Sequence, residues 1–199
     1  MTQMLILSFM MGLIGGAIAS TIILKLQTKT PQDLIKEFYA VETAVHVSPH
    51  HLRKHMAQGD DSFILVDLRS QQEYEKEHII GAINIPAYVT PEQSAYGDVE
   101  RIVTEFSKLS KNKEIIVYCY SMPCMTGRKI GKMLADKGIF VKHLVIGWNE
   151  WRYFWDLWNH EHEWEQIKVE DYVATSKNTG KIITETNPNT CTIEGNFSC

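Results

Sequence analysis

Between residues 44 and 145 the chain alternates short apolar runs with longer segments of mixed polarity. The runs 63–66 and 114–118 are almost continuously apolar, which is typical of strands buried on both faces. Shorter runs at 44–47 and 142–145 are two further strand candidates. Helices are predicted between the strands, at residues 49–58, 71–76, 92–109 and 126–137. Strands that alternate with helices predict an α/β fold with a central, mostly parallel sheet flanked by helices.

A different pattern stands at the N-terminus. Residues 4–24 contain no charged side chain, and as a helix they are long enough to cross a bilayer of roughly 30 Å. No Lys or Arg precedes this run, which disfavours a cleaved signal peptide, although residues 17–19 resemble a cleavage site. We therefore predict a transmembrane anchor over residues 1–25 and a single-pass membrane protein. A stalk over 26–46 should follow, with a helix that starts at Thr30.

Residues 159–199 are polar and turn-rich, and we predict that they form a tail. Cys191 and Cys199 within this tail are best explained as a disulfide, which requires an oxidising compartment. Lys25 and Lys29 directly after the apolar span instead favour a cytoplasmic domain. These two indications conflict, so the sequence leaves open the side of the membrane on which the domain lies.

Composition narrows the classes of function. The formal net charge is −4 and no Lys/Arg-rich patch carries interleaved aromatic residues, so nucleic-acid binding is not expected. His50, His51 and His55 share one predicted helix, and the run 160–163 is His-Glu-His-Glu. We interpret both groups as solvated side chains and predict neither a metal site nor a cofactor.

Candidate chemistry lies at the ends of the two apolar strands. Asp67 and Cys119 each follow one of them, and parallel strands bring their carboxyl ends to the edge where open α/β folds bind ligands. A helix is predicted to begin shortly after Cys119, and helix N-termini and nearby cations favour the thiolate form of cysteine. Loop N–H groups that turn inward would form an anion-binding nest. Local chemistry alone does not distinguish a reactive Cys119 from a buried, inert one.

The residues around both strand ends resemble the signature of the rhodanese family. The upstream part comprises Asp67, Arg69, Glu73, Tyr74, His78, Ile79, Gly81, Ala82, Asn84 and Pro86. The sequence Val-Tyr-Cys at 117–119 resembles the family's active-site strand end, and Gly-Trp-Asn-Glu-Trp at 147–151 resembles its closing segment. The resemblance covers about residues 47–155.

This resemblance implies a three-layer rhodanese-like domain over residues 47–158 that acts as a sulfurtransferase. A cysteine thiolate would take sulfane sulfur from a donor such as thiosulfate and hold it as a persulfide. It would then pass the sulfur to a thiophilic acceptor, a thiol or a cyanide-like molecule. Asp67 and Arg69 would brace the active-site loop, either as a structural ion pair or with a catalytic role.

The loop departs from the family pattern because it is longer. Met122 and Cys124 occupy the positions where the family has glycine and arginine, and Gly127-Arg128 arrives later. We prefer Cys119 as the nucleophile because of its position at the strand end, with Cys124 as a second thiol or the alternative nucleophile. Substrate contacts are expected from Tyr120, Ser121, Met122, Met125, Thr126, Gly127 and Arg128. A dithiol redox protein that uses both cysteines and a catalytically silent binding module remain open alternatives.

All five tryptophans lie between residues 148 and 164. Trp151, Trp155 and Trp158 follow helical spacing, so we predict that they share one face of a single helix. Trp148 and Trp151 should pack onto the sheet. The surplus of large aromatic side chains predicts a surface for a protein partner or for the bilayer interface.

Overall fold

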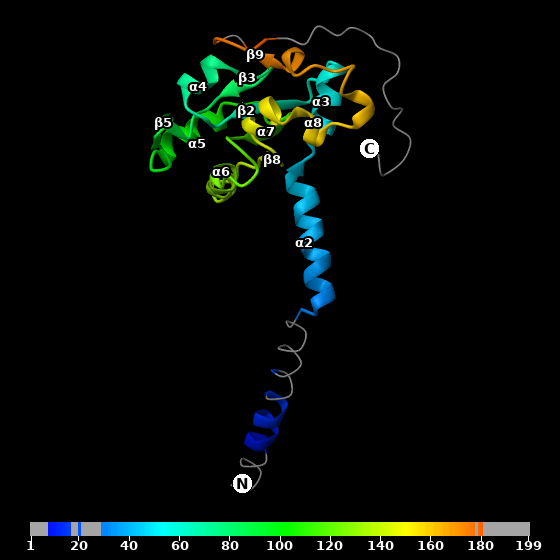
Figure 1. Ribbon diagram of the computed structural model, residues 1–199. Helices are drawn as coiled ribbons and strands as arrows, with labels where there is room; N and C mark the ends of the chain where they lie inside the picture. Colours follow the sequence, from blue (N-terminus) through cyan, green and yellow to red (C-terminus); the bar gives the residue numbers. More distant parts are fainter. Residues whose placement is uncertain (1–7, 17–19, 21–28, 178, 181–199) are drawn as a thin grey trace. The chain divides into compact units, whose positions relative to one another are not determined.

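A computed structural model describes residues 8–16, 20, 29–177 and 179–180 of the 199-residue chain. The chain divides into two compact units, Met1–Thr43 and Ala44–Cys199, and each is described by itself. Figure 1 shows the helices and strands with the labels used below.

The first unit contributes helical residues 8–16 and most of α2 (Pro31–Val45). The Thr30 hydroxyl accepts a hydrogen bond from the Asp33 backbone N–H (3.1 Å), which confirms the predicted start of this helix. The helix continues through residues 44–45, which were predicted as part of a strand. Among the described residues no helix is long and apolar enough to cross a membrane. Residues 4–7, 17–19 and 21–24 of the predicted anchor lie outside the described part, so the anchor stays a prediction.

The second unit is built on a five-stranded sheet in the order β1-β8-β7-β2-β4, and every neighbouring pair is parallel. The strands are β1 (His46–Val47), β2 (Phe63–Asp67), β4 (Ile83–Asn84), β7 (Glu114–Tyr118) and β8 (Lys142–Leu144). The two long apolar runs of the sequence are therefore β2 and β7, which lie side by side in the interior of the sheet. The predicted parallel sheet is confirmed.

Helices cover both faces of this sheet, which gives the unit three layers (Figure 1). Side chains alternate along β7, so that Ile116 and Tyr118 enter one apolar cluster while Ile115 and Val117 enter the other. The first cluster includes residues of α3 (Pro49–Ala57), α4 (Gln71–Lys76), α7 (Trp148–Tyr153) and α8 (Trp155–Trp158). The second includes residues of α5 (Val99–Ser107) and α6 (Thr126–Ala135).

The predicted helix over 92–109 is wrong in its first third. This stretch begins with β6 (Gln93–Ser94), which pairs with the preceding β5 (Tyr88–Thr90) in a small antiparallel hairpin, and α5 starts only at Val99. The Thr-Pro-Glu turn of the hairpin resembles a helix start, because proline suits both positions.

The single tryptophan helix is also wrong. The helix ends at Tyr153, Phe154 adopts a non-helical backbone (φ −127°, ψ 41°), and α8 begins at Trp155. The change of direction lets the rings pack on one another, with centroids 4.9 Å apart for Trp151 and Trp158 and 4.7 Å for Trp155 and Trp158. Trp151 and Trp155 are buried, so these rings mainly fill the core.

The folded unit extends past the predicted boundary at residue 158. Two short 3₁₀ helices, η1 (Glu161–Glu163) and η2 (Val169–Tyr172), lead into β9 (Val173–Ala174), which pairs antiparallel with β3 (His78–Ile79). Tyr172 is buried in the first cluster, and its carbonyl accepts a hydrogen bond from the Trp151 indole (3.3 Å). Residues 159–174 therefore belong to the fold rather than to a tail. The predicted disulfide between Cys191 and Cys199 lies outside the described residues.

Candidate active site

The two strand ends singled out in the sequence meet at one edge of the sheet. Asp67 of β2 and Tyr118 of β7 stand opposite each other in register, and Cys119 follows directly. The loops that leave both strands therefore start side by side at the carboxyl edge, where α/β sheets form ligand sites.

The loop over residues 119–125 is held in place by the N-terminus of α7. The backbone N–H groups of Trp148 and Asn149 donate to the carbonyls of Cys119 and Tyr120, both at 2.8 Å. The Glu150 carboxylate accepts from the Met122 N–H at 3.1 Å. These hydrogen bonds hold the first two carbonyls of the loop toward α7. In this arrangement the loop can direct backbone N–H groups toward the cysteines.

Close approach of the backbones requires glycine at position 147. A Cβ atom added there would lie 2.2 Å from the Ser121 nitrogen and 2.4 Å from the Tyr120 carbonyl carbon. Neither atom belongs to a flexible side chain, so a larger residue would push the loop away.

The two loop cysteines lie in contact. The Cys124 N–H donates to the Ser121 carbonyl (3.0 Å), and this turn brings Cys124 back over the strand end. The thiols of Cys119 and Cys124 are hydrogen-bonded to each other. They differ in access, since Cys119 is 2% exposed while Cys124 is half-buried.

Their surroundings separate the acidities of the two thiols. The pKa of Cys124 is lowered to about 5, chiefly by the hydrogen bond from Cys119. The Thr126 hydroxyl and the N–H groups of Thr126 and Tyr120 lower this pKa further, whereas partial burial raises it. The hydrogen bond to Cys124, together with burial, raises the pKa of Cys119. These effects favour the thiolate form of the accessible sulfur and the protonated form of the buried one.

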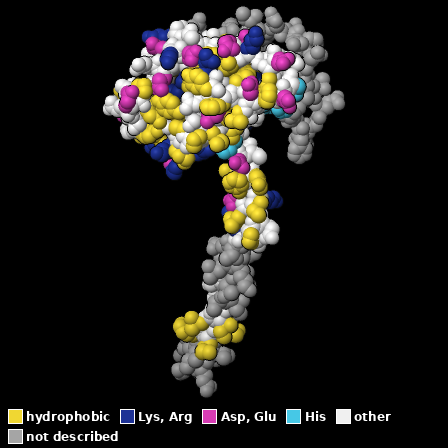
Figure 2. All heavy atoms as spheres, in the orientation of Figure 1, with side chains coloured by type: hydrophobic (Ala, Val, Ile, Leu, Met, Phe, Trp, Pro, Cys, Tyr) yellow, Lys and Arg dark blue, Asp and Glu magenta, His cyan; other side chains and the backbone are white. Residues whose placement is uncertain are grey.

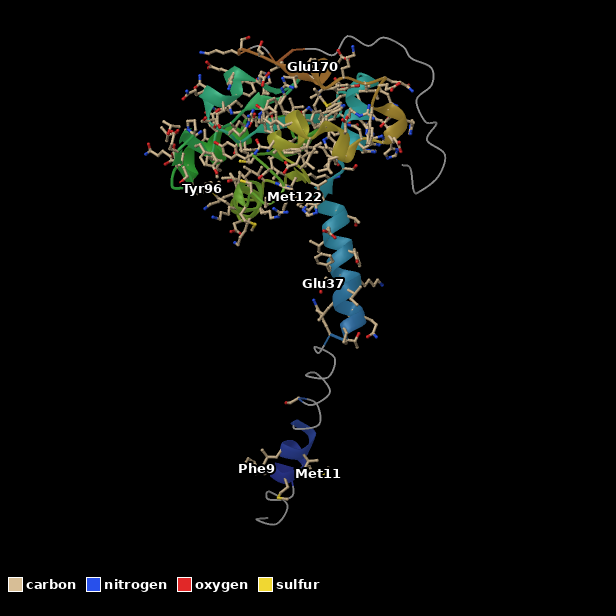
Figure 3. The ribbon with its side chains drawn as sticks, in the orientation of Figure 1. Phe9, Met11, Glu37, Tyr96, Met122 and Glu170 are labelled. Carbon is tan, nitrogen blue, oxygen red and sulfur yellow. The ribbon has the colours of Figure 1, made fainter. Side chains whose placement is uncertain are left out.

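A cluster of three hydroxyl groups, which no sequence motif indicated, lies beside the Cys124 sulfur. The Thr126 Oγ1 lies 3.2 Å from Cys124 Sγ, 2.8 Å from the Tyr88 hydroxyl and 2.6 Å from the Tyr96 hydroxyl. When both tyrosines donate to Thr126, its own proton points at the sulfur. Tyr88 lies in β5 and Tyr96 (labelled in Figure 3) follows β6, and only Tyr96 falls within the helix predicted over 92–109.

Asp67 and Arg69 form a buried ion pair beneath the loops. Arg69 donates to Asp67 through Nη2 (2.7 Å) and Nε, and the Tyr118 hydroxyl donates to the same carboxylate (2.7 Å). The guanidinium lies 4.4 Å from the centre of the Trp148 ring. Although burial alone would lower the pKa of Arg69, the charge of Asp67 raises it. The pair therefore links the end of β2 to the end of β7 and to α7.

A family model described as the rhodanese-like domain matches residues 48–153, more than half of the chain. This chain belongs to the rhodanese-like domain family. The matched region contains the sheet, both strand-end loops and the α7 segment that holds the cysteine loop.

Two curated proteins share part of this rhodanese-like region. The chain is 35% identical over 100 residues to the "putative sulfur carrier protein YrkF" of Bacillus subtilis, covering 49% of this chain and 46% of YrkF. It is 32% identical over 88 residues to the "HTH-type transcriptional regulator Rv0324" of Mycobacterium tuberculosis, covering 44% of this chain and 34% of that protein. The chain thus spans between a third and a half of the length of these relatives.

Solved structures share the fold. A full-length protein from Lactobacillus plantarum superposes with a TM-score of 0.50 at 18% identity, covering 62% of this chain and 94% of that one. The rhodanese-like domain of the Anabaena protein Alr3790 gives 0.45 at 18% identity, covering 77% and 91%.

The other predicted contact residues of this rhodanese-like domain divide into two groups. Arg128 donates to the carbonyls of Met122 (3.2 Å) and Cys124 (3.4 Å), so it braces the loop from outside. Met122 and Met125 are exposed at the rim of the loop, and Figure 3 shows Met122 near α6. On the face drawn in Figure 2, hydrophobic side chains lie among acidic and basic ones across this unit. The two methionines add apolar surface at the entrance to the thiols.

Tyr120, Ser121 and Gly127 have structural partners. The Tyr120 hydroxyl donates to Glu73 (2.6 Å), and Ser121 closes the turn that carries Cys124. A Cβ on Gly127 would lie 2.2 Å from the buried His143 ring, so α6 starts against that ring.

One group of metal-capable side chains lies away from this edge of the domain. His50, His160 and Glu163 come within 4.8 Å of one another, and His50 is buried, so its predicted solvation is wrong. Glu163 already accepts a hydrogen bond from the Arg53 guanidinium (2.6 Å). The two imidazole rings are stacked and nearly parallel (7°), so their in-plane lone pairs do not converge on one ion. This group fits an ion-pair network better than a metal centre.

Proposed function

We propose that the protein is a sulfurtransferase that moves sulfane sulfur from a small donor to a thiophilic acceptor through a cysteine persulfide. The observation that carries the proposal is the accessible thiol of Cys124, held by hydroxyl and amide donors at the ligand edge of a rhodanese-like sheet. The description of YrkF as a putative sulfur carrier supports the same chemistry.

The geometry favours Cys124 over Cys119 as the attacking thiolate, against the preference drawn from strand position. Cys119 is almost fully buried and donates its proton to Cys124, whereas Cys124 faces the loop opening. With thiosulfate as donor, Cys124–S⁻ attacks the outer sulfur and gives Cys124–S–S⁻ while sulfite leaves. An acceptor thiolate or cyanide then attacks the terminal sulfur and regenerates Cys124–S⁻.

The loop donors suit both states of this cycle. The N–H groups of Tyr120 and Thr126 and the Thr126 hydroxyl stabilise one negative charge, whether it lies on the thiolate or on the persulfide beside it. Asp67, Arg69 and Arg128 act indirectly, because they fix the strand end and the loop backbone.

The test uses the full chain with Cys191→Ser and Cys199→Ser, so that the only sulfhydryl groups are those of the loop. During anaerobic incubation with thiosulfate, sulfite release and a reductant-sensitive change of intact mass show sulfur uptake, and thiocyanate formed when cyanide is present from the start shows transfer. Cys124→Ser should abolish both. A chain that takes up no sulfur from thiosulfate or from an organic persulfide would instead be a binding module.

Membrane anchoring through residues 4–24 is a separate proposal, supported by the uncharged apolar run. The full chain should stay in the membrane fraction after a high-salt wash, since a hydrophobic span is insensitive to screening. Recovery in the soluble fraction, whole or shortened, would refute it.

A further inference from the structure

The persulfide mechanism carries sulfur on one of the two loop thiols and gives Cys119 no covalent role. Cys119 is a nucleophile buried in the apolar cluster beneath the loop and hydrogen-bonded to Cys124. A buried cysteine with a purely packing role would not need a second sulfur directly above it. The turn closed by Ser121 and Cys124 is what brings the two sulfurs together.

We propose that Cys119 resolves the persulfide on Cys124, so that the loop releases the transferred sulfur as hydrosulfide and closes as a Cys119–Cys124 disulfide. This inference rests on the proposed sulfurtransferase function and adds a second product, sulfide, and a second substrate, a reducing thiol. The loop then works as a thiosulfate-reducing dithiol, with a protein dithiol or a small thiol as the reductant that reopens it.

The arrangement of the sulfurs suits this step. Cys119 occupies the inner side of Cys124 Sγ, so a sulfur taken from a donor adds on the open side, where Cys124 reaches solvent. The attacking sulfur, the central sulfur and the leaving sulfur can then approach a line, as thiol–disulfide exchange requires. Met122 and Met125 at the rim leave that outward side to the donor.

Atoms and charge balance in two steps. Cys124–S⁻ and thiosulfate give Cys124–S–S⁻ and sulfite. Cys119–SH and Cys124–S–S⁻ then give the Cys119–S–S–Cys124 disulfide and HS⁻, with the Cys119 proton leaving on the sulfide. The bond between Sγ of Cys124 and the added sulfur breaks, and the bond between the two Sγ atoms forms. Thiosulfate gains two electrons from the dithiol, and the reducing thiol later restores them.

Loading also changes the environment of Cys119. Before loading, its proton is shared with the Cys124 thiolate. Afterwards Cys124 Sγ is part of a persulfide whose charge lies mainly on the outer sulfur, so that hydrogen bond weakens. The Tyr120 N–H and the Thr126 hydroxyl, which contact Cys119 as well as Cys124, are then able to stabilise a Cys119 thiolate. The same donors therefore serve both half-reactions.

The experiment compares single variants in the full chain that lacks Cys191 and Cys199, under anaerobic conditions without added thiol. With thiosulfate, the parent chain should release sulfite and an equal amount of sulfide and lose two hydrogens from its mass. Assayed at about pH 9, where Cys124 is largely ionised without the Cys119 hydrogen bond, Cys119→Ser and Cys119→Ala should release sulfite, gain one sulfur and release no sulfide until a thiol is added. Cys124→Ser should do none of these. The serine variant keeps a hydrogen-bond donor and the alanine variant keeps an apolar side chain, so the two check each other for packing effects.

The outcomes separate the two proposals. A parent chain that holds its sulfur without releasing sulfide would overturn the resolving role and leave the sulfurtransferase proposal standing. Loading that fails in both Cys119 variants but survives in Cys124→Ser would make Cys119 the nucleophile and also overturn it. Absence of sulfur uptake by every chain, from thiosulfate and from an organic persulfide, would refute the sulfurtransferase function itself.

Discussion

The Thr126 hydroxyl offers a direct measure of how the loop stabilises its thiolate. Thr126→Val removes the hydroxyl 3.2 Å from Cys124 Sγ and keeps the branched shape of the buried side chain. Tyr88 and Tyr96 still have each other as partners, because their hydroxyls lie 3.0 Å apart. The change should therefore act on the acidity of Cys124 more than on the fold.

The expected shift follows from the hydrogen bond that is lost. A hydrogen bond to a charged group contributes about 1.5–3 kcal/mol, and solvent screening at the half-buried Cys124 favours the lower end. At 1.36 kcal/mol per unit, the pKa of Cys124 should rise by about one unit from its value of about 5. At pH 5.5 the thiolate fraction should then fall roughly threefold, and near pH 7.5 it should hardly change.

The assay is the rate of alkylation by iodoacetamide as a function of pH, followed by intact mass in the chain without Cys191 and Cys199. Thr126→Ser keeps the hydroxyl and serves as the matched control. The reasoning would be refuted if the alkylation midpoint of Thr126→Val equals that of the parent chain, or if the serine control shifts by as much as the valine variant.

Three further predictions concern the support of this site. Gly147→Ala should lower the free energy of unfolding by about 1–3 kcal/mol and impair sulfite release, because its Cβ would meet the loop backbone. Gly97→Ala is the control, since open space surrounds this glycine, and it should change neither the thermal melt nor the thiosulfate assay. Tyr172→Ala should lower the free energy of unfolding, measured in urea, by about 3–5 kcal/mol, and Glu165→Ala at an exposed position should hardly change it. Equal effects of the two substitutions would place residues 159–174 outside the fold. Burial lowers the pKa of His143 to about 4, so its contribution to stability is complete above about pH 6.5 and is lost as the pH falls toward 4. His143→Gln should flatten that part of the Tm–pH curve, and an unchanged slope would contradict the assignment.

The parts of the fold that the sequence predicted are those where burial leaves an unbroken pattern. Strands β2 and β7 are covered on both faces, so their apolar runs are continuous and their ends mark the site. The β5–β6 hairpin has strands of two or three residues, too short to show a periodicity, and its proline suits a helix start equally well. The break at Phe154 involves neither glycine nor proline. It results from the packing of Trp158 on Trp151, which only the folded state reveals.

The same distinction applies to the site. Cys119, Cys124, Asp67 and Arg69 were found because strand ends and a family signature mark them. The roles proposed for the two thiols rest on a turn that folds Cys124 back over Cys119, whereas position at the strand end had favoured Cys119 as the nucleophile. The hydroxyl cluster depends on a contact between Thr126 and a hairpin about thirty residues earlier, for which the sequence carries no local signal.

The connections between the ends of this unit have a consequence for its synthesis. Strand β1 can pair only after β8 has been synthesised, since His46 pairs with His143. Strand β3 can likewise pair only after β9 has been synthesised, since His78 pairs with Ala174. Such distant pairings carry a large loop-closure entropy and form late. A nascent chain that has just passed Cys124 already carries both loop thiols, but it lacks the glycine and the amide groups of residues 147–149 that orient them. The surroundings of the two thiols are thus completed only after translation of the segment that follows.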